Sequence, residues 1–141
     1  MDTAANKASA IAFMNEFSSG NREAAWRRTT DDLTWTMNQH TIPDGKLAVF
    51  DRQSYDAMVA SSDNLFPQGI VITVTDAVAD NDRVMLEAHG SGPLSDGRSY
   101  ANHYIFTFRF RDGLIAEVAE YLDTAYAQAM LAFTIEMPGK P

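Results

Sequence analysis

Hydrophobic residues in the first part of the chain recur mostly at helical spacing. Over residues 3–19 they return every three or four positions, which predicts an amphipathic helix that stops at Gly20. Residues 22–29 suit a second short helix, and Asp51 can cap a third helix that runs to about Ser61. Three helices are therefore expected in this part of the chain.

Most other segments alternate apolar and polar residues, which is the period of a β-strand. Residues 33–38 alternate in this way, and Asp112-Gly113 favours a type I′ turn between two later strands. The segment 42–50 is turn-rich, and residues 124–133 suit a closing helix. The later strands are predicted over 69–78, 83–90, 99–111 and 114–123.

The order of these elements predicts the fold class. Two helices, a strand and a third helix precede a meander of four strands, which indicates an α+β domain with an antiparallel sheet. A length of 141 residues suits a single domain over 1–141. A curved sheet wrapped around helices tends to leave a pocket at its open end, where ligands fit.

Composition narrows the possible partners. The 11 basic and 19 acidic residues leave a net charge of −8, which disfavours nucleic acid and anionic membranes as partners. The chain has no cysteine, so disulfides and thiolate chemistry are excluded. No apolar run approaches the roughly 20 residues of a membrane span, and the polar N-terminus lacks a secretory pattern. A cytoplasmic location is the default expectation.

The C-terminal half contains a recognisable pattern. The segment GRSYANHYIFTFRFRDGLIAEVAEYLDTAYA, residues 97–127, resembles the SnoaL-like and ketosteroid isomerase-related branch of the nuclear transport factor two-like superfamily. The resemblance extends over nearly the whole chain. It implies a cone-shaped domain with a deep apolar pocket. It does not imply one function, because this fold hosts isomerases, dehydratases, cyclases, epoxide hydrolases and binding modules.

The resemblance also implies a register for the site. Set beside the epoxide hydrolases of this superfamily, the catalytic positions fall on Glu87, His89 and Glu120. This register turns Glu87 and His89 toward the pocket, together with Asn102 and Tyr104 on the next strand. The other residues expected in the pocket wall are Met14, Phe17, Trp35, Met37, Tyr55, Met85, Phe106, Val118 and Leu122.

Proton transfer is the chemistry that these groups suit. A neutral His89 bonded to a carboxylate is a usable general base, with Glu120 or Glu87 as its orienting or acid partner. Tyr104 and Asn102 would bind a developing oxyanion. The alternatives are purely structural roles: His89 as a core histidine, and Glu87 in a salt bridge with Arg83 or Arg98.

Three functions follow from this interpretation. The leading hypothesis is a cofactor-independent isomerase, dehydratase or aldol-type cyclase that acts on a small hydrophobic ring-containing carbonyl compound. The second is a non-catalytic module for small-ligand binding or dimerisation. A weaker third is an epoxide hydrolase-like enzyme. The three histidines show no metal-ligand spacing, so no metal or cofactor is expected.

The sheet face opposite the predicted pocket is expected to be too apolar to remain in water, so a homodimer through this face is predicted. The residues assigned to this outer face are Val84, Leu86, Ala101, Ile105, Ile115 and Tyr121.

Overall fold

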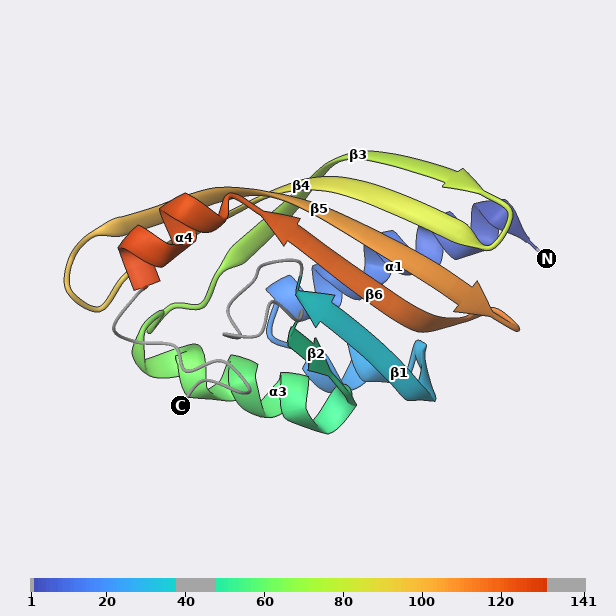
Figure 1. The fold of residues 1–141 in the computed structure, drawn as a ribbon, viewed down its shortest axis with the longest axis horizontal. Coiled ribbons are helices and arrows are strands. Elements are labelled where there is room, and N and C mark those ends of the chain that lie inside the picture. The colour runs from blue at the N-terminus through green and yellow to red at the C-terminus, as the bar shows by residue number, and fades with distance from the viewer. Residues whose placement is uncertain (1, 38–47, 132–141) are drawn as a thin grey trace.

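The computed structural model describes residues 2–37 and 48–131, which form a curved sheet with helices packed against it (Figure 1). The helices are α1 (Thr3–Ser18), α2 (Arg22–Trp26), α3 (Arg52–Ser61), the 3-10 helix η1 (Ser62–Asn64) and α4 (Thr124–Leu131). The strands are β1 (Thr29–Met37), β2 (Ala48–Phe50), β3 (Val71–Asp80), β4 (Arg83–Pro93), β5 (Ser99–Arg111) and β6 (Leu114–Leu122).

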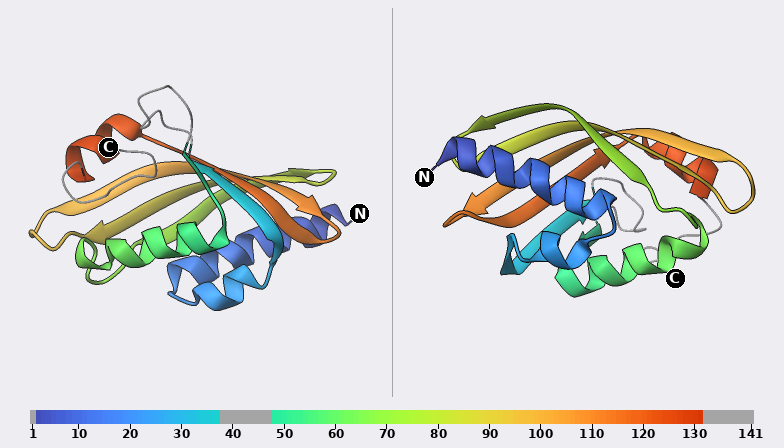
Figure 2. Two further views of the ribbon diagram at one scale, coloured as in Figure 1. Left: turned by 60° about the horizontal axis from the view of Figure 1, so that its bottom comes forward. Right: turned by 180° about the vertical axis from the view of Figure 1, so that it is seen from behind.

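The strands form one six-stranded sheet in the order β2-β1-β6-β5-β4-β3. Neighbouring strands run antiparallel except for β1 and β6, which pair in parallel. The α+β class is confirmed, whereas the parallel pair was not predicted. Helices α1, α2 and α3 lie against one face of the sheet, which we call the inner face (Figure 2).

Local sequence signals account for most helix boundaries. The side chain of Asp2 accepts a hydrogen bond from the Ala5 amide at the start of α1. Asp51 and Ser54 form a reciprocal capping box at the start of α3. At the start of α4, the Asp123 carboxylate accepts a hydrogen bond from the Tyr126 amide. Each of these helices begins where the sequence predicts it.

Two predicted boundaries differ from the structure. Helix α2 ends at Trp26 because Thr29 already begins β1, so the predicted helix over 22–29 is too long. Within the turn-rich segment 42–50, the last three residues form β2, which pairs with β1. Residues 42–47 of that segment and 132–133 of the predicted closing helix lie outside the described residues.

The predicted type I′ turn between β5 and β6 is confirmed. Asp112 and Gly113 have φ angles of 54° and 80°, so both central residues adopt positive φ. This turn sets β6 antiparallel to β5, and a register shift between Arg109 and Phe110 then brings Phe106 opposite Glu120. The hairpin thereby places Glu120 on the same face as the core residue Phe106.

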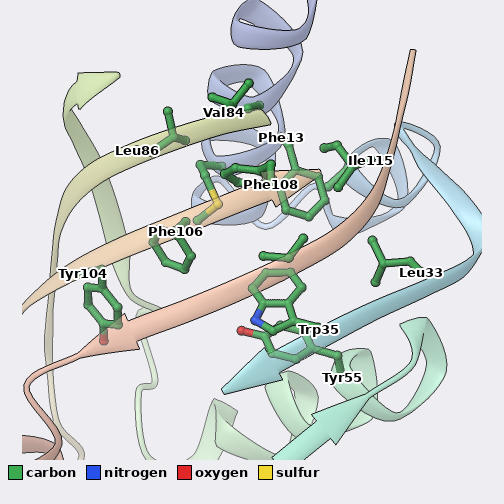
Figure 3. Packing of buried hydrophobic residues seen from close by; sticks show 14 of the residues in the cluster. Phe13, Leu33, Trp35, Tyr55, Val84, Leu86, Tyr104, Phe106, Phe108 and Ile115 are labelled. Carbon is green, nitrogen blue, oxygen red and sulfur yellow. The ribbon is translucent and has the colours of Figure 1, made fainter. Parts of the chain in front are cut away.

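The hydrophobic core lies between the inner face of the sheet and the helices (Figure 3). Phe13 of α1 packs against Trp35 of β1 and Phe108 of β5, with ring centroids 5.8 Å apart in both pairs. Leu33 and Trp35 are fully buried on one side of β1, as the alternation of this strand predicts. A smaller cluster joins Leu65, Phe66, Leu94 and Tyr100 near the start of β5.

The predicted orientation of β4 is wrong. Leu86 is fully buried, whereas Met85 is 41% exposed. Glu87 lies opposite Ile105 and His89 opposite His103, and partners across an antiparallel pair point to the same side of a sheet. Met85, Glu87 and His89 therefore lie on the outer face, away from the helices.

The predicted outer face changes with this register. Val84, Leu86 and Ile115 belong to the core on the inner face. Ala101, Ile105 and Tyr121 are exposed, as predicted. No helix in the described part of the chain has the length and apolar character needed to cross a membrane.

Candidate active site

A pocket of about 290 Å³ lies between the inner face of the sheet and the helices. Its deep wall comprises Met14, Phe17, Trp35, Tyr55, Tyr104, Phe106 and Glu120. Its rim is formed by the connection between α1 and α2 and by residues 62–70, and includes the polar residues Ser18, Ser19, Arg22, Ser62, Asp63 and Gln68. The pocket is thus apolar at depth and polar at its opening.

Glu120 brings a carboxyl group to the deep wall. Its side chain is buried, and the Tyr55 hydroxyl and the Trp35 indole N–H each donate a hydrogen bond to Oε1 at 3.0 Å. The two donor rings stack with centroids 3.7 Å apart (Figure 3). No described residue donates a hydrogen bond to Oε2, so the described contacts hold the carboxyl group by one oxygen.

The surroundings of Glu120 shift its ionisation. Burial raises its pKa, because the charged form loses hydration, and the hydrogen bonds from Tyr55 and Trp35 oppose this rise. A carboxyl group with a raised pKa is protonated more readily near neutral pH than a free one. Such a group can both accept and return a proton, which is the requirement for acid–base catalysis.

Tyr104 brings a hydroxyl group to the same pocket. Its ring stacks near-parallel on Phe106, and its hydroxyl oxygen lies 2.7 Å from that of Tyr100. Burial raises the pKa of Tyr104, so its hydroxyl remains protonated. A buried, protonated hydroxyl in the same pocket as a carboxyl group can donate a hydrogen bond to a ligand oxygen.

Asn102 lies behind this pair and not in the pocket wall. Its Nδ2 donates to the Tyr100 hydroxyl at 2.9 Å and to the Asp123 carbonyl at 3.1 Å. Its Oδ1 accepts from the amides of His103 at 2.8 Å and Asp123 at 3.3 Å. These bonds occupy the whole amide, so the predicted direct contact of Asn102 with a ligand is wrong.

The other predicted wall residues divide into two groups. Met14, Phe17, Trp35, Tyr55 and Phe106 line the pocket, as predicted. The predicted wall residues that do not line the pocket are Met37 and Val118, which are packed in the core, Met85 on the outer face, and Leu122, which lies opposite Tyr104 and packs against the core.

His89 and Glu87 border an open groove of about 830 Å³ on the outer face, together with His103, Ile105 and Tyr121. The His89 and His103 rings lie 5.2 Å apart. The sheet separates these groups from Glu120, so the predicted convergence of His89, Glu87 and Glu120 is wrong. The proposed salt bridge from Glu87 to Arg98 is not formed either, because Arg98 pairs with Asp96 at 2.8 Å.

Sequence reasoning missed the residues at the rim of the pocket. Arg22 is an example: its Nε donates to Asp56 at 2.8 Å, and Asp56 also accepts from the Trp26 indole at 2.8 Å. The Arg22 hydrogen bond, partly opposed by burial, holds the pKa of Asp56 below its ordinary value. The available signal was the Ser-Ser-Gly turn after α1, since ligand contacts concentrate on connecting segments.

The described residues contain no cluster of three histidine or acidic side chains placed to hold a metal ion. The candidate site consists of one buried carboxyl group, one buried hydroxyl and an apolar wall.

Comparison with known proteins identifies the family. Residues 10–118 match the SnoaL-like domain, and the chain belongs to this family. No match to a curated protein is found.

Solved structures share the fold at low identity. A putative hydroxylase from Streptomyces galilaeus, AclR, is 14% identical with a TM-score of 0.76 over 93% of this chain and 98% of its own. A putative SnoaL-like polyketide cyclase from Jannaschia sp. CCS1 is 16% identical with a TM-score of 0.73, over 94% and 93%. A hypothetical protein with a ketosteroid isomerase-like fold from Catenulispora acidiphila, in complex with trimethylamine, is 19% identical with a TM-score of 0.69, over 86% and 90%. At these identities the likeness shows the fold alone.

Proposed function

We propose that this protein is a cofactor-independent proton-transfer enzyme that acts on a small hydrophobic ring-containing carbonyl compound. The observation that carries the proposal is the buried Glu120 carboxyl group in the deep wall of an apolar pocket that also presents the Tyr104 hydroxyl. Isomerisation, dehydration and aldol-type cyclisation share the required step, which is proton movement next to a carbonyl. The polyketide cyclase and ketosteroid isomerase-like neighbours support this choice of reaction class.

The pocket chemistry assigns a role to each group. Ionised Glu120 takes a proton from the carbon next to the ligand carbonyl, and the hydrogen bonds from Tyr55 and Trp35 fix the orientation of its carboxyl group. The electron pair of the broken C–H bond forms an enolate, whose oxygen accepts a hydrogen bond from Tyr104. Glu120 then returns the proton to a carbon of the ligand or to a leaving hydroxyl.

This assignment replaces a histidine base. An imidazole on the outer face cannot reach a ligand among Trp35, Tyr104 and Glu120, so His89 and Glu87 are left out of the mechanism. The same geometry does not support the epoxide hydrolase hypothesis, which relied on the side chains at positions 87 and 89 in the pocket.

The test is hydrogen–deuterium exchange at the carbon next to the carbonyl in a panel of cyclic ketones of one to three rings. We expect wild-type protein to catalyse exchange and Glu120→Gln to lose on the order of 10²–10⁴-fold in rate, the usual contribution of a general acid–base group. The matched control is His89→Ala, which should retain the wild-type rate. Loss of exchange in His89→Ala, or its retention in Glu120→Gln, would contradict the proposal.

A non-catalytic ligand-binding module is the second candidate. One observation favours it: Oε1 of Glu120 accepts two buried hydrogen bonds, which is also how a purely structural carboxyl group is held. This candidate predicts that the wild-type protein binds cyclic ketones but catalyses no exchange with any member of the panel.

A further inference from the structure

A chain of hydrogen bonds leads from the junction of β6 and α4 to the pocket. Its first link is the Asn102 amide, whose orientation the backbone fixes. Oδ1 accepts from the amides of His103 and Asp123, so the other end of the side-chain amide must be the N–H₂ donor. That end donates to the Asp123 carbonyl and to the Tyr100 hydroxyl oxygen.

The hydrogen-bond partners of Tyr100 show which hydroxyl donates in the bond between Tyr100 and Tyr104. The Tyr100 side chain is buried and receives a hydrogen bond from Asn102, so its own hydroxyl hydrogen needs an acceptor. Among the described residues, the hydroxyl oxygen of Tyr104, at 2.7 Å, is the acceptor within reach. Tyr100 therefore donates to Tyr104.

The last link points to the ligand. Once Tyr104 accepts from Tyr100, its own hydrogen finds no other acceptor among the described residues, and Tyr104 lines the pocket. The chain thus runs in one direction, from Asn102 through Tyr100 to Tyr104 and into the pocket. Each donor in such a chain polarises the next one and strengthens it.

We propose that Asn102 is a positioning residue that commits the Tyr104 hydroxyl to donate into the pocket, so that the ligand places an acceptor oxygen there. This inference rests on the proposed function, since it concerns the oxygen-binding part of the same site. It narrows the ligand to compounds whose oxygen at this point only accepts, such as a ketone carbonyl. A compound with the same rings and no oxygen would leave the Tyr104 donor unpaired.

The experiment compares 1-tetralone with tetralin, the same two-ring hydrocarbon without the carbonyl. Isothermal titration gives the ratio of their dissociation constants, and infrared spectroscopy gives the carbonyl stretching frequency of bound 1-tetralone. In wild-type protein we expect a carbonyl frequency below that in an apolar solvent. In Tyr104→Phe, Tyr100→Phe and Asn102→Leu, we expect the preference for 1-tetralone to fall by roughly 2- to 10-fold, the equivalent of one hydrogen bond.

Two variants guard against a merely structural effect. Tyr100→Phe tests the chain even if Asn102→Leu fails to fold, because it removes only the hydroxyl that links Asn102 to Tyr104. Tyr126→Phe is the matched control: its ring stacks on Tyr100, but its hydroxyl bonds to the backbone of β5. The control should keep both the wild-type preference and the wild-type carbonyl frequency.

The outcomes separate this inference from the proposed function. If Tyr104→Phe loses the preference while Tyr100→Phe and any folded Asn102→Leu keep it, the role of Asn102 is overturned and the proposed function stands. If the variants behave as expected but wild-type protein catalyses no exchange, the directed donor stands and catalysis is overturned. Wild-type protein that binds neither compound, or shows no lowered carbonyl frequency, overturns the inference.

Discussion

Burial of Glu120 couples protein stability to pH at the scale of one residue. The pKa of Glu120 in the folded state is raised above its ordinary value of 4.5, so the folded protein holds this proton more tightly than the unfolded chain does. The contribution of Glu120 to the free energy of unfolding is therefore greatest below pH 4.5 and decreases as pH rises through the folded-state pKa.

Glu120→Gln should remove this dependence, since glutamine has a similar shape, does not ionise and can still accept hydrogen bonds from Tyr55 and Trp35. We expect the difference in unfolding free energy, variant minus wild type, to increase between pH 5 and pH 8. Urea denaturation at a series of pH values measures it. A difference that stays constant, or decreases with pH, would contradict a raised pKa.

Tyr55 tunes the same carboxyl group. Its hydroxyl stabilises the ionised form of Glu120, so Tyr55→Phe should raise the pKa of Glu120 further. If ionised Glu120 is the base, the rate of ketone exchange rises with pH through this pKa. The rise should move to higher pH in Tyr55→Phe and stay in place in Tyr126→Phe. If the pH dependence of the exchange rate is unchanged in Tyr55→Phe, Glu120 is not the base for the exchange.

The error on β4 is also a residue-scale lesson. Val84, Leu86 and Ala88 form the more apolar set of this strand, and plain alternation places them in the core, where the structure has them. The resemblance to epoxide hydrolases favoured the opposite set through an ungapped alignment, and a shift of one residue reverses every side chain. Glu120 and Tyr104 were assigned correctly to the inner face. The turn at residues 112–113 does not by itself turn Glu120 inward, because a register shift between Arg109 and Phe110 moves the later pairing by one residue and sets Glu120 opposite Phe106.

At the scale of elements, β4 and β5 meet closely where Gly90 crosses the Tyr104 ring. A Cβ atom at Gly90 would lie 2.7 Å from Cε1 of Tyr104 and 3.0 Å from Cδ1 of Ile72. Gly90→Ala should therefore displace the Tyr104 ring and lower the free energy of unfolding by about 1–3 kcal/mol, the usual cost of overpacking. Urea denaturation checks this value, and Ser91→Ala, on the opposite face of β4, should change it little. A Gly90→Ala variant as stable as wild type would show that the Tyr104 ring can shift without cost.

Elements set by local chemistry were predictable from the sequence. Capping residues mark the starts of α1, α3 and α4, and the Asp-Gly pair marks the turn before β6. Elements set by distant contacts were not. The three-residue strand β2 exists through its pairing with β1. Strand β1 lies parallel to the distant strand β6, and Met37 of β1 is in register with Glu120 of β6.

At the scale of the whole molecule, the pocket depends on segments that the sequence leaves open. Its deep wall consists largely of regular elements, so alternation and helical spacing could identify Phe17, Trp35 and Phe106. Its rim joins the connection after α1 to residues 62–70, two segments far apart in the sequence. Hydrophobic periodicity and turn residues are local patterns, so they do not predict that two distant connections meet around one opening.

The outer face gives the last prediction, a homodimer with a second copy as the partner. Ile105 and Tyr121 lie next to each other across β5 and β6, and Met85 lies on neighbouring β4, all of them exposed. Along these strands Arg109 already pairs with Glu117 of its own chain, so a two-fold contact depends on this apolar centre. Ile105→Lys should convert a dimer into a monomer in sedimentation velocity, whereas Val49→Lys, at an exposed position on edge strand β2, should leave it intact. A wild-type monomer at high micromolar concentration, or an Ile105→Lys dimer as tight as wild type, would exclude this face as the interface.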